Sequence, residues 1–79
     1  MSNTEFIYHG QTLYVNLNGK YKSKNIKILK SKIYSIIDQY GINDIIIDKK
    51  LTTEIDNVAF YEMLDEYDIK YGGNLIVEE

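Results

Sequence analysis

The sequence contains no cysteine, no proline, no tryptophan and no arginine. Without cysteine the chain has neither disulfides nor thiolate metal sites, and its composition is consistent with a reducing cytosol. The absence of arginine argues against nucleic acid as a ligand, because proteins that bind phosphate backbones usually use the bidentate guanidinium group. A formal net charge of −3 also argues against a polyanion such as nucleic acid as the ligand.

Long apolar runs are also absent from the sequence. No segment approaches the roughly 20 apolar residues that a membrane-spanning helix needs. The first residues, "MSNTEFIYHG", do not combine a basic start with an apolar run, so they are unlike a signal peptide. We therefore expect one soluble, cytoplasmic domain over residues 1–79, with no membrane partner. A chain of this size buries only about 60–65% of its unfolded surface, so the core is small.

Charge is distributed unevenly along the chain. The segment "KYKSKNIKILKSK" (20–32) holds six lysines and no acid, whereas residues 52–68 hold six acids and no lysine. The first lysines of the basic segment are candidate contacts for a phosphate or an acidic partner: Lys20, Lys22, Lys24 and Lys27. The alternative is a solvated start of a helix, which is the more common meaning of such a cluster.

The N-terminal part of the chain has the pattern of a β-hairpin. In "EFIYHGQTLYVNL" (5–17), two segments rich in β-formers flank a turn at Gly10. Apolar residues in the second segment alternate with Tyr14 and Asn16, which predicts one buried face. The residues "NGK" (18–20) are predicted to end this strand.

Two helices and two further strands are predicted after the hairpin. Apolar residues at three- and four-residue steps predict a helix over about 25–40, ended by Gly41. The run "NDIIID" (43–48) predicts a central strand, a second helix spans about 57–67, and "LIVEE" (75–79) is the last strand. The inner face of the second helix comprises Phe60, Met63, Leu64 and Tyr67.

The order ββαβαβ predicts an α/β fold with a four-stranded mixed sheet and both helices on one face. The two-residue period of strands assigns side chains to the two faces of this sheet. The residues expected to face the helices are Leu13, Val15, Leu17, Ile45, Ile47, Leu75 and Val77. The residues expected on the opposite face are Ile7, Tyr14, Ile46 and Ile76.

No arrangement of residues indicates catalysis. His9, the single histidine, lies in the hairpin turn without an acid beside it in sequence. Asp44 and Asp48 flank a strand, but polar residues commonly end an apolar run. We therefore expect no enzymatic activity, no metal site and no cofactor.

Asp56 precedes the second helix in "TEIDNVAFYEML" (53–64). Its simplest role is that of the N-cap, in which the carboxylate accepts backbone N–H bonds at the positive end of the helix dipole. Capping is compatible with contact to a partner. A catalytic role would require a base, a nucleophile or a metal ligand nearby, and the sequence offers none.

Three stretches of the chain stand out together, namely "LYVNLNGKY", "KILKSKIYSIIDQYGINDIIID" and "EIDNVAFYEMLDEYDIKYGGNLIVEE". They resemble the STAS domain of sulphate transporters and bacterial anti-sigma-factor antagonists, and the spacing runs almost without gaps over residues 6–79. The most specific feature is an aspartate that opens a helix and a glycine turn that leads into a strand. The resemblance implies a non-enzymatic, regulatory protein that binds another protein, such as an anti-sigma factor or a related scaffold.

The sequence departs from this family in two places. In phospho-regulated antagonists the residue after the aspartate is a phosphorylated serine, and here it is Asn57, which has no hydroxyl. Family members usually continue with a further helix, so the chain is expected to be shortened at its C-terminus.

Two functional hypotheses follow. The first is partner binding at the start of the second helix, through Asp56, Asn57, Val58 and Tyr61. The alternative is a structural or self-assembling protein that forms a homodimer through the uncovered face of the sheet. Binding of a small anion or nucleotide by the lysine cluster is a third, weaker hypothesis.

Overall fold

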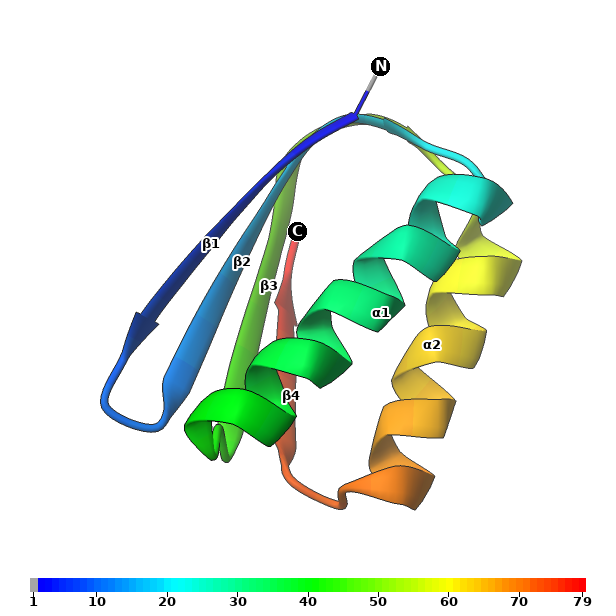
Figure 1. Cartoon of the computed structure of the whole chain (residues 1–79). Coiled ribbons are helices and arrows are strands. Elements are labelled where there is room, and N and C mark those ends of the chain that lie inside the picture. The colour runs from blue at the N-terminus through cyan, green and yellow to red at the C-terminus, as the bar shows by residue number, and fades with distance from the viewer. Residues whose placement is uncertain (1) are drawn as a thin grey trace.

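The computed structural model describes residues 2–79. Its strands and helices follow one another in the predicted order (Figure 1), namely β1 (Ser2–His9), β2 (Thr12–Tyr21), α1 (Ser23–Tyr40), β3 (Asp44–Ile55), α2 (Asn57–Lys70) and β4 (Asn74–Glu78).

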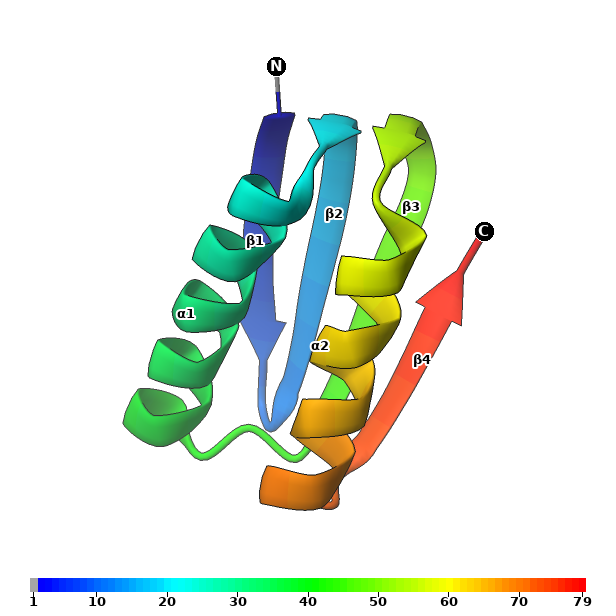
Figure 2. The ribbon, with the colours of Figure 1, turned by 90° about the vertical axis from the view of Figure 1, so that its right-hand side faces the viewer.

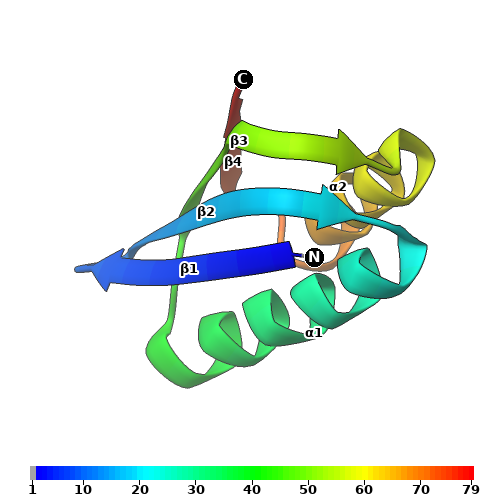
Figure 3. The ribbon, with the colours of Figure 1, turned by 90° about the horizontal axis from the view of Figure 1, so that it is seen from above.

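The four strands form one mixed sheet in the order β1-β2-β3-β4. β1 runs antiparallel to β2, whereas β3 is parallel to both β2 and β4. Both helices cover the same face of this sheet, and the other face is open (Figures 1 and 3). The predicted ββαβαβ fold, with two helices on one face, is therefore confirmed.

The core lies between the sheet and the two helices. The side chains predicted to face the helices are buried on β2 and β3, and Leu75 and Val77 of β4 pack against the same core. Leu13, Val15 and Ile47 are each 0% exposed. Successive turns of each helix contribute buried apolar residues, and α2 buries Phe60, Met63 and Tyr67 as predicted, while Leu64 of the predicted inner face is half-buried. The strand period and the helical period thus place the apolar side chains in one layer.

The ends of α1 are set by local hydrogen bonds. The Asn25 side-chain oxygen accepts a hydrogen bond from the Lys22 backbone amide at 2.9 Å. At the other end Gly41 adopts a left-handed conformation with φ 64°, and its amide donates to the Ile37 carbonyl at 2.9 Å. This ending was predicted, because glycine takes positive φ without the steric penalty of a Cβ atom.

Three strands are longer than the sequence predicts, and the first of them, β1, begins at Ser2 rather than at residue 5. The "NGK" segment does not end β2, which continues to Tyr21 because Gly19 absorbs an irregularity of the β2–β3 register with φ 96°. β3 continues past Asp48 to Ile55, since the extended β2 supplies its hydrogen-bonding partner. α2 likewise extends three residues beyond Tyr67, to Lys70.

Candidate functional site

Both helices begin at the same end of the molecule, directly after the parallel strands β2 and β3 (Figures 1 and 2). The backbone amide of Asp56 donates a hydrogen bond to the Tyr21 carbonyl at 2.8 Å, so the two strand-to-helix connections are tied together. This geometry brings the first turn of α1 close to the first turn of α2. In parallel α/β sheets this is the end at which loops present ligand-binding residues.

Asp56 is the N-cap of α2, as predicted. One of its carboxylate oxygens accepts a hydrogen bond from the backbone amide of Ala59 at 3.1 Å. The side chain is half-buried, and its charge lies at the positive end of the helix dipole. The aspartate therefore has a structural role that needs no partner.

The residues that follow Asp56 face outward. Asn57 is exposed, Val58 is 70% exposed and Tyr61 is 53% exposed, whereas Phe60 between them is fully buried. The edge of the Tyr61 ring lies against Phe60, with 5.8 Å between the ring centroids. The helical phase predicted from the sequence is thus confirmed. We call the patch formed by Asp56, Asn57, Val58 and Tyr61 the α2-start surface.

The four candidate anion-contacting lysines are spread over the end of β2 and the first half of α1. Lys20 lies near the end of β2, opposite Glu54 of β3 in the strand register, while Lys22 and Lys24 are exposed around the start of α1. Lys27 lies one turn further along α1, beside the second helix. The four lysines therefore do not form one cluster, and a carboxylate beside Lys20 weakens its attraction for an external anion.

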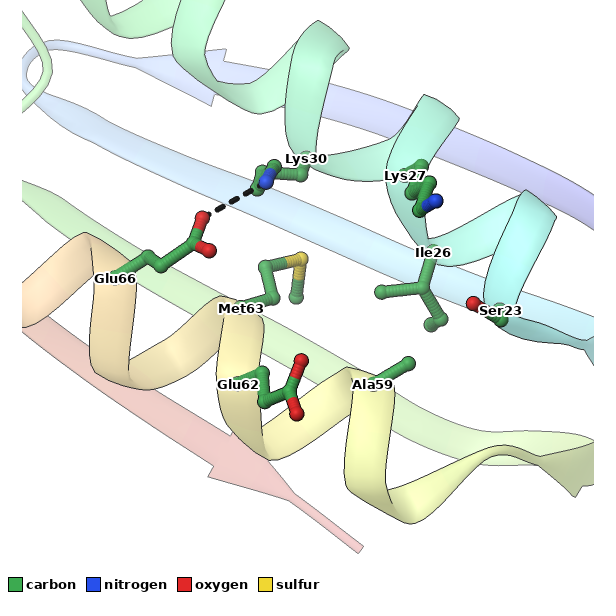
Figure 4. A pocket seen from close by; sticks show the side chains of 8 residues that line it. All are labelled: Ser23, Ile26, Lys27, Lys30, Ala59, Glu62, Met63 and Glu66. Atoms are coloured by element: carbon green, nitrogen blue, oxygen red, sulfur yellow. Dashed lines mark hydrogen bonds and ion pairs between the residues drawn. The ribbon is translucent and has the colours of Figure 1, made fainter.

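A groove of about 140 Å³ separates the two helices (Figure 4). Lys27 and Lys30 line it from α1, and Glu62 and Glu66 line it from α2. The Lys30 ammonium lies 2.8 Å from the Glu66 carboxylate, and this hydrogen bond raises the pKa of Lys30. The groove is smaller than the roughly 300–1,000 Å³ of typical small-molecule sites. Through the Lys30–Glu66 contact, the basic segment 20–32 and the acidic segment 52–68 face one another across this groove.

The acidic neighbours Glu54 and Glu62 were not predicted to lie beside the lysines. Their positions depend on the pairing of β2 with the polar half of β3 and on the packing of α1 against α2. Neither the strand pairing nor the helix packing produces a pattern of apolar residues from which the sequence would predict these neighbours. The feature of the sequence that pointed to such contacts was the opposite charge of segments 20–32 and 52–68.

Within residues 2–79 no group of three or more histidine, cysteine, aspartate or glutamate side chains is placed to hold a metal ion. Over the same residues, no helix is both long and apolar enough to cross a membrane. His9 lies exposed at the end of β1.

Comparison with solved structures places this architecture among known folds. The anti-sigma factor antagonist SpoIIAA in its unphosphorylated form superposes with a TM-score of 0.75 over 95% of this chain and 71% of SpoIIAA, at 17% sequence identity. The phosphorylated form of SpoIIAA, a Bacillus cell fate determinant, gives a TM-score of 0.70 over 94% of this chain and 69% of that chain, at 18% identity.

The fold of this chain is that of SpoIIAA. A crystal structure of Mglu contains the same architecture, with a TM-score of 0.79 at 15% identity over 95% of this chain, but the match spans 19% of Mglu. No protein-family model matches the sequence, and no curated protein matches it. At these identities the likeness to SpoIIAA and Mglu establishes the fold, and the resemblance to STAS domains is confirmed at that level.

Proposed function

We propose that this chain is a non-enzymatic interaction module that binds a protein partner through the α2-start surface. The observation that carries the proposal is the exposure of Val58 and Tyr61 on a helix whose opposite face is buried. Two apolar side chains one turn apart, both more than half exposed, form an anchor on the outer side of α2. The fold shared with an anti-sigma factor antagonist supports the same kind of role.

The chemistry around this anchor indicates the kind of partner. Glu62 and Asp65 are exposed on α2, and Asp56 caps its start, so the anchor has an acidic border. Such a border favours a basic partner and disfavours an acidic one. By analogy with SpoIIAA the partner is an anti-sigma factor or a related scaffold, in the cytoplasm of a bacterium.

We propose that this module lacks the phosphoserine switch that the resemblance to phospho-regulated STAS antagonists implies. The residue after the capping aspartate is Asn57, whose amide cannot accept a phosphoryl group. The neighbouring Thr52 hydroxyl donates a hydrogen bond to the Lys49 carbonyl at 2.7 Å, and Thr52 lies on β3 rather than on the helix. Partner binding is therefore expected to be constitutive.

Substitution of the anchor tests partner binding. A partner is captured from the native host with the immobilised chain, and its affinity is then measured by calorimetry. The double variant Val58→Ser with Tyr61→Ser should stay folded and weaken binding by more than about tenfold. The matched control is Ile69→Ser, since Ile69 is 86% exposed at the far end of the same helix. Equal affinity for the wild type and the double variant would place the interface elsewhere.

Mass spectrometry tests the absence of the switch. After incubation with an anti-sigma-factor kinase, the wild-type chain should carry no stoichiometric phosphate. The variant Asn57→Ser restores the hydroxyl at the acceptor position and should be phosphorylated. Full modification of the wild type at Thr52 or Thr53 would contradict the proposal.

Self-association through the open face of the sheet is a second candidate function. Ile7, Tyr14, Ile46 and Ile76 are direct register partners on four adjacent strands, so they form one apolar row across the open face. We call these four residues the open-face row. Ile7 is 48% and Ile76 is 57% exposed. A face-to-face dimer would cover the row, and Ile76→Ser should abolish that dimer in a light-scattering measurement.

A further inference from the structure

β1 is an edge strand of unusual composition. Within the part of the chain that the structure describes, it pairs with β2 and with no other strand. One side of its backbone is therefore available to an added strand. Its residues, Ser2–His9, include no lysine and no proline, although proteins commonly use both to protect such edges. This strand is consequently a candidate for pairing with another strand.

The second half of β1 is complementary to itself. The sequence Glu5-Phe6-Ile7-Tyr8-His9 has an acid at one end and an imidazole at the other, two aromatic residues inside them and an isoleucine at the centre. When a second copy of the segment runs antiparallel to the first, the acid lies opposite the imidazole, each aromatic ring lies opposite an aromatic ring, and isoleucine lies opposite isoleucine. Aromatic pairs are among the cross-strand combinations that stabilise antiparallel sheets, and a carboxylate can accept a hydrogen bond from an imidazole N–H.

We propose that two copies of this chain associate through their β1 edges in antiparallel pairing, with Ile7 of one copy opposite Ile7 of the other. In this register Glu5 of each copy faces His9 of the other, and Phe6 of each copy faces Tyr8 of the other. The contact is an isologous, two-fold interface, in which every pair of residues except the central Ile7–Ile7 pair occurs twice. It makes one sheet from the sheets of both copies.

The orientation of the side chains fits this register. Phe6 packs against the core on the helix-covered side, and Tyr8 stacks on Tyr40 of α1 with 4.5 Å between ring centroids. Glu5, Ile7 and His9 alternate with these residues and therefore lie on the open face. Each proposed pair thus joins side chains of the same face.

Neighbouring registers are less favourable. A register centred on Phe6 would set Glu5 against Ile7, and one centred on Glu5 would set two carboxylates against each other. The matching of carboxylate with imidazole and of aromatic ring with aromatic ring therefore selects the register centred on Ile7.

The same register aligns the open-face rows of the two copies. Ile7 is the end of the row at the β1 edge, so pairing of Ile7 with Ile7 joins the two rows into one. Face-to-face packing lacks this complementarity. The open face carries the acids Glu5, Asp44, Asp48 and Glu78, and Asp48 is paired there with Lys50 at 3.8 Å. Edge pairing matches each residue of one copy with a suitable residue of the other, and it is therefore the arrangement that we propose for a second copy.

The edge contact is expected to be weak. It comprises five residue pairs, and α1 runs beside the same edge (Figure 2), so Lys32 of each copy adds like charge near the contact. Sedimentation velocity is therefore measured up to a concentration of about 1 mM. The wild-type chain should show a reversible monomer–dimer equilibrium.

Charge exchange identifies the register. Glu5→Lys alone sets a lysine against His9, and His9→Glu alone sets two glutamates against each other, so each variant should be monomeric. When the two variants are mixed, every pair across the edge is again complementary, and a heterodimer should form. Native mass spectrometry distinguishes this heterodimer from homodimers by mass. A wild-type chain that remains monomeric, or a mixture that stays monomeric while the wild type dimerises, would overturn the proposal.

Two controls separate edge pairing from face-to-face packing and from a loss of folding. Ile76→Ser lies on β4, far from the β1 edge, and should leave the edge dimer intact while disrupting a face-to-face dimer. Glu5→Lys also removes a hydrogen bond that Asn16 donates to Glu5 at 3.1 Å, so circular dichroism must show that each variant is folded. Loss of the dimer in Ile76→Ser, with Glu5→Lys unaffected, would assign self-association to the open face instead.

Discussion

The carboxylate of Asp56 accepts a hydrogen bond from the backbone amide of Ala59 at 3.1 Å, at the start of the helix proposed to bind a partner. Asp56→Ala should lower the free energy of unfolding by about 1 kcal/mol, because it removes the N-cap. Asp56→Asn should lower it by about 0.5 kcal/mol or less, since asparagine caps nearly as well without the charge. Urea unfolding measures both values. If both variants weaken partner binding equally, the charge contributes to the interface in addition to the cap.

Gly73 packs too closely against its neighbours to accept a side chain. A Cβ atom at this position would meet the Tyr67 hydroxyl and lie 2.6 Å from the Asn43 carbonyl oxygen. Gly73→Ala should therefore lower the free energy of unfolding by about 1–3 kcal/mol. Chemical denaturation of Gly73→Ala, Tyr67→Phe and the double variant measures the coupling. The double variant should recover part of the lost free energy of unfolding, because one of the two obstructing oxygen atoms is absent. If the changes in unfolding free energy of the two single variants simply add, the Tyr67 hydroxyl does not obstruct the added methyl group.

The Tyr34 hydroxyl is buried and, among the residues that the structure describes, has no hydrogen-bond partner. Tyr34→Phe should raise the free energy of unfolding by about 1 kcal/mol, because it removes an unsatisfied polar group. The matched variant is Tyr71→Phe, since the Tyr71 hydroxyl donates to the Asp38 carboxylate at 3.1 Å. That change should be neutral or destabilising by up to about 1 kcal/mol. Thermal and urea unfolding compare the two; destabilisation by Tyr34→Phe would show that its hydroxyl is satisfied by water.

Alkaline pH should destabilise the fold. Burial raises the pKa of Tyr34 and that of Tyr67 above the usual value of tyrosine. The folded chain therefore retains these protons at a pH at which the unfolded chain has released them. Their contribution to stability is fully present below about pH 10 and is lost as the pH rises through the folded-state pKa values. Urea unfolding across this range, with phenolate absorbance recorded in parallel, checks the prediction, and unchanged stability above about pH 10 would refute it.

The Phe variants also test the origin of this pH dependence. The double variant Tyr34→Phe with Tyr67→Phe lacks both phenols and should lose less stability between about pH 9 and pH 11 than the wild type. An unchanged alkaline transition in the double variant would assign it to other groups.

Local patterns in the sequence determined much of this architecture. The alternation of Leu13, Val15 and Leu17 predicted the buried face of β2, because strand side chains alternate between faces. The three- and four-residue spacing around Phe60 predicted both the buried face of α2 and the exposure of Val58 and Tyr61. Asp56 was predicted as a cap because a carboxylate before an apolar helical run satisfies free backbone amides.

Other features were decided by tertiary structure alone. β3 extends through residues 49–55, which are mostly polar, because the end of β2 pairs with Leu51, Thr52, Glu54 and Ile55, and backbone pairing leaves no mark on the side-chain pattern. Lys30 meets Glu66 because α1 packs beside α2, although the two residues are 36 positions apart in the chain. The open-face row exists because the register aligns Ile7, Tyr14, Ile46 and Ile76. The periodicity of apolar residues along a strand or helix predicts which face a side chain occupies. Which residue that side chain meets on another strand or helix depends on contacts between segments that are distant in the sequence.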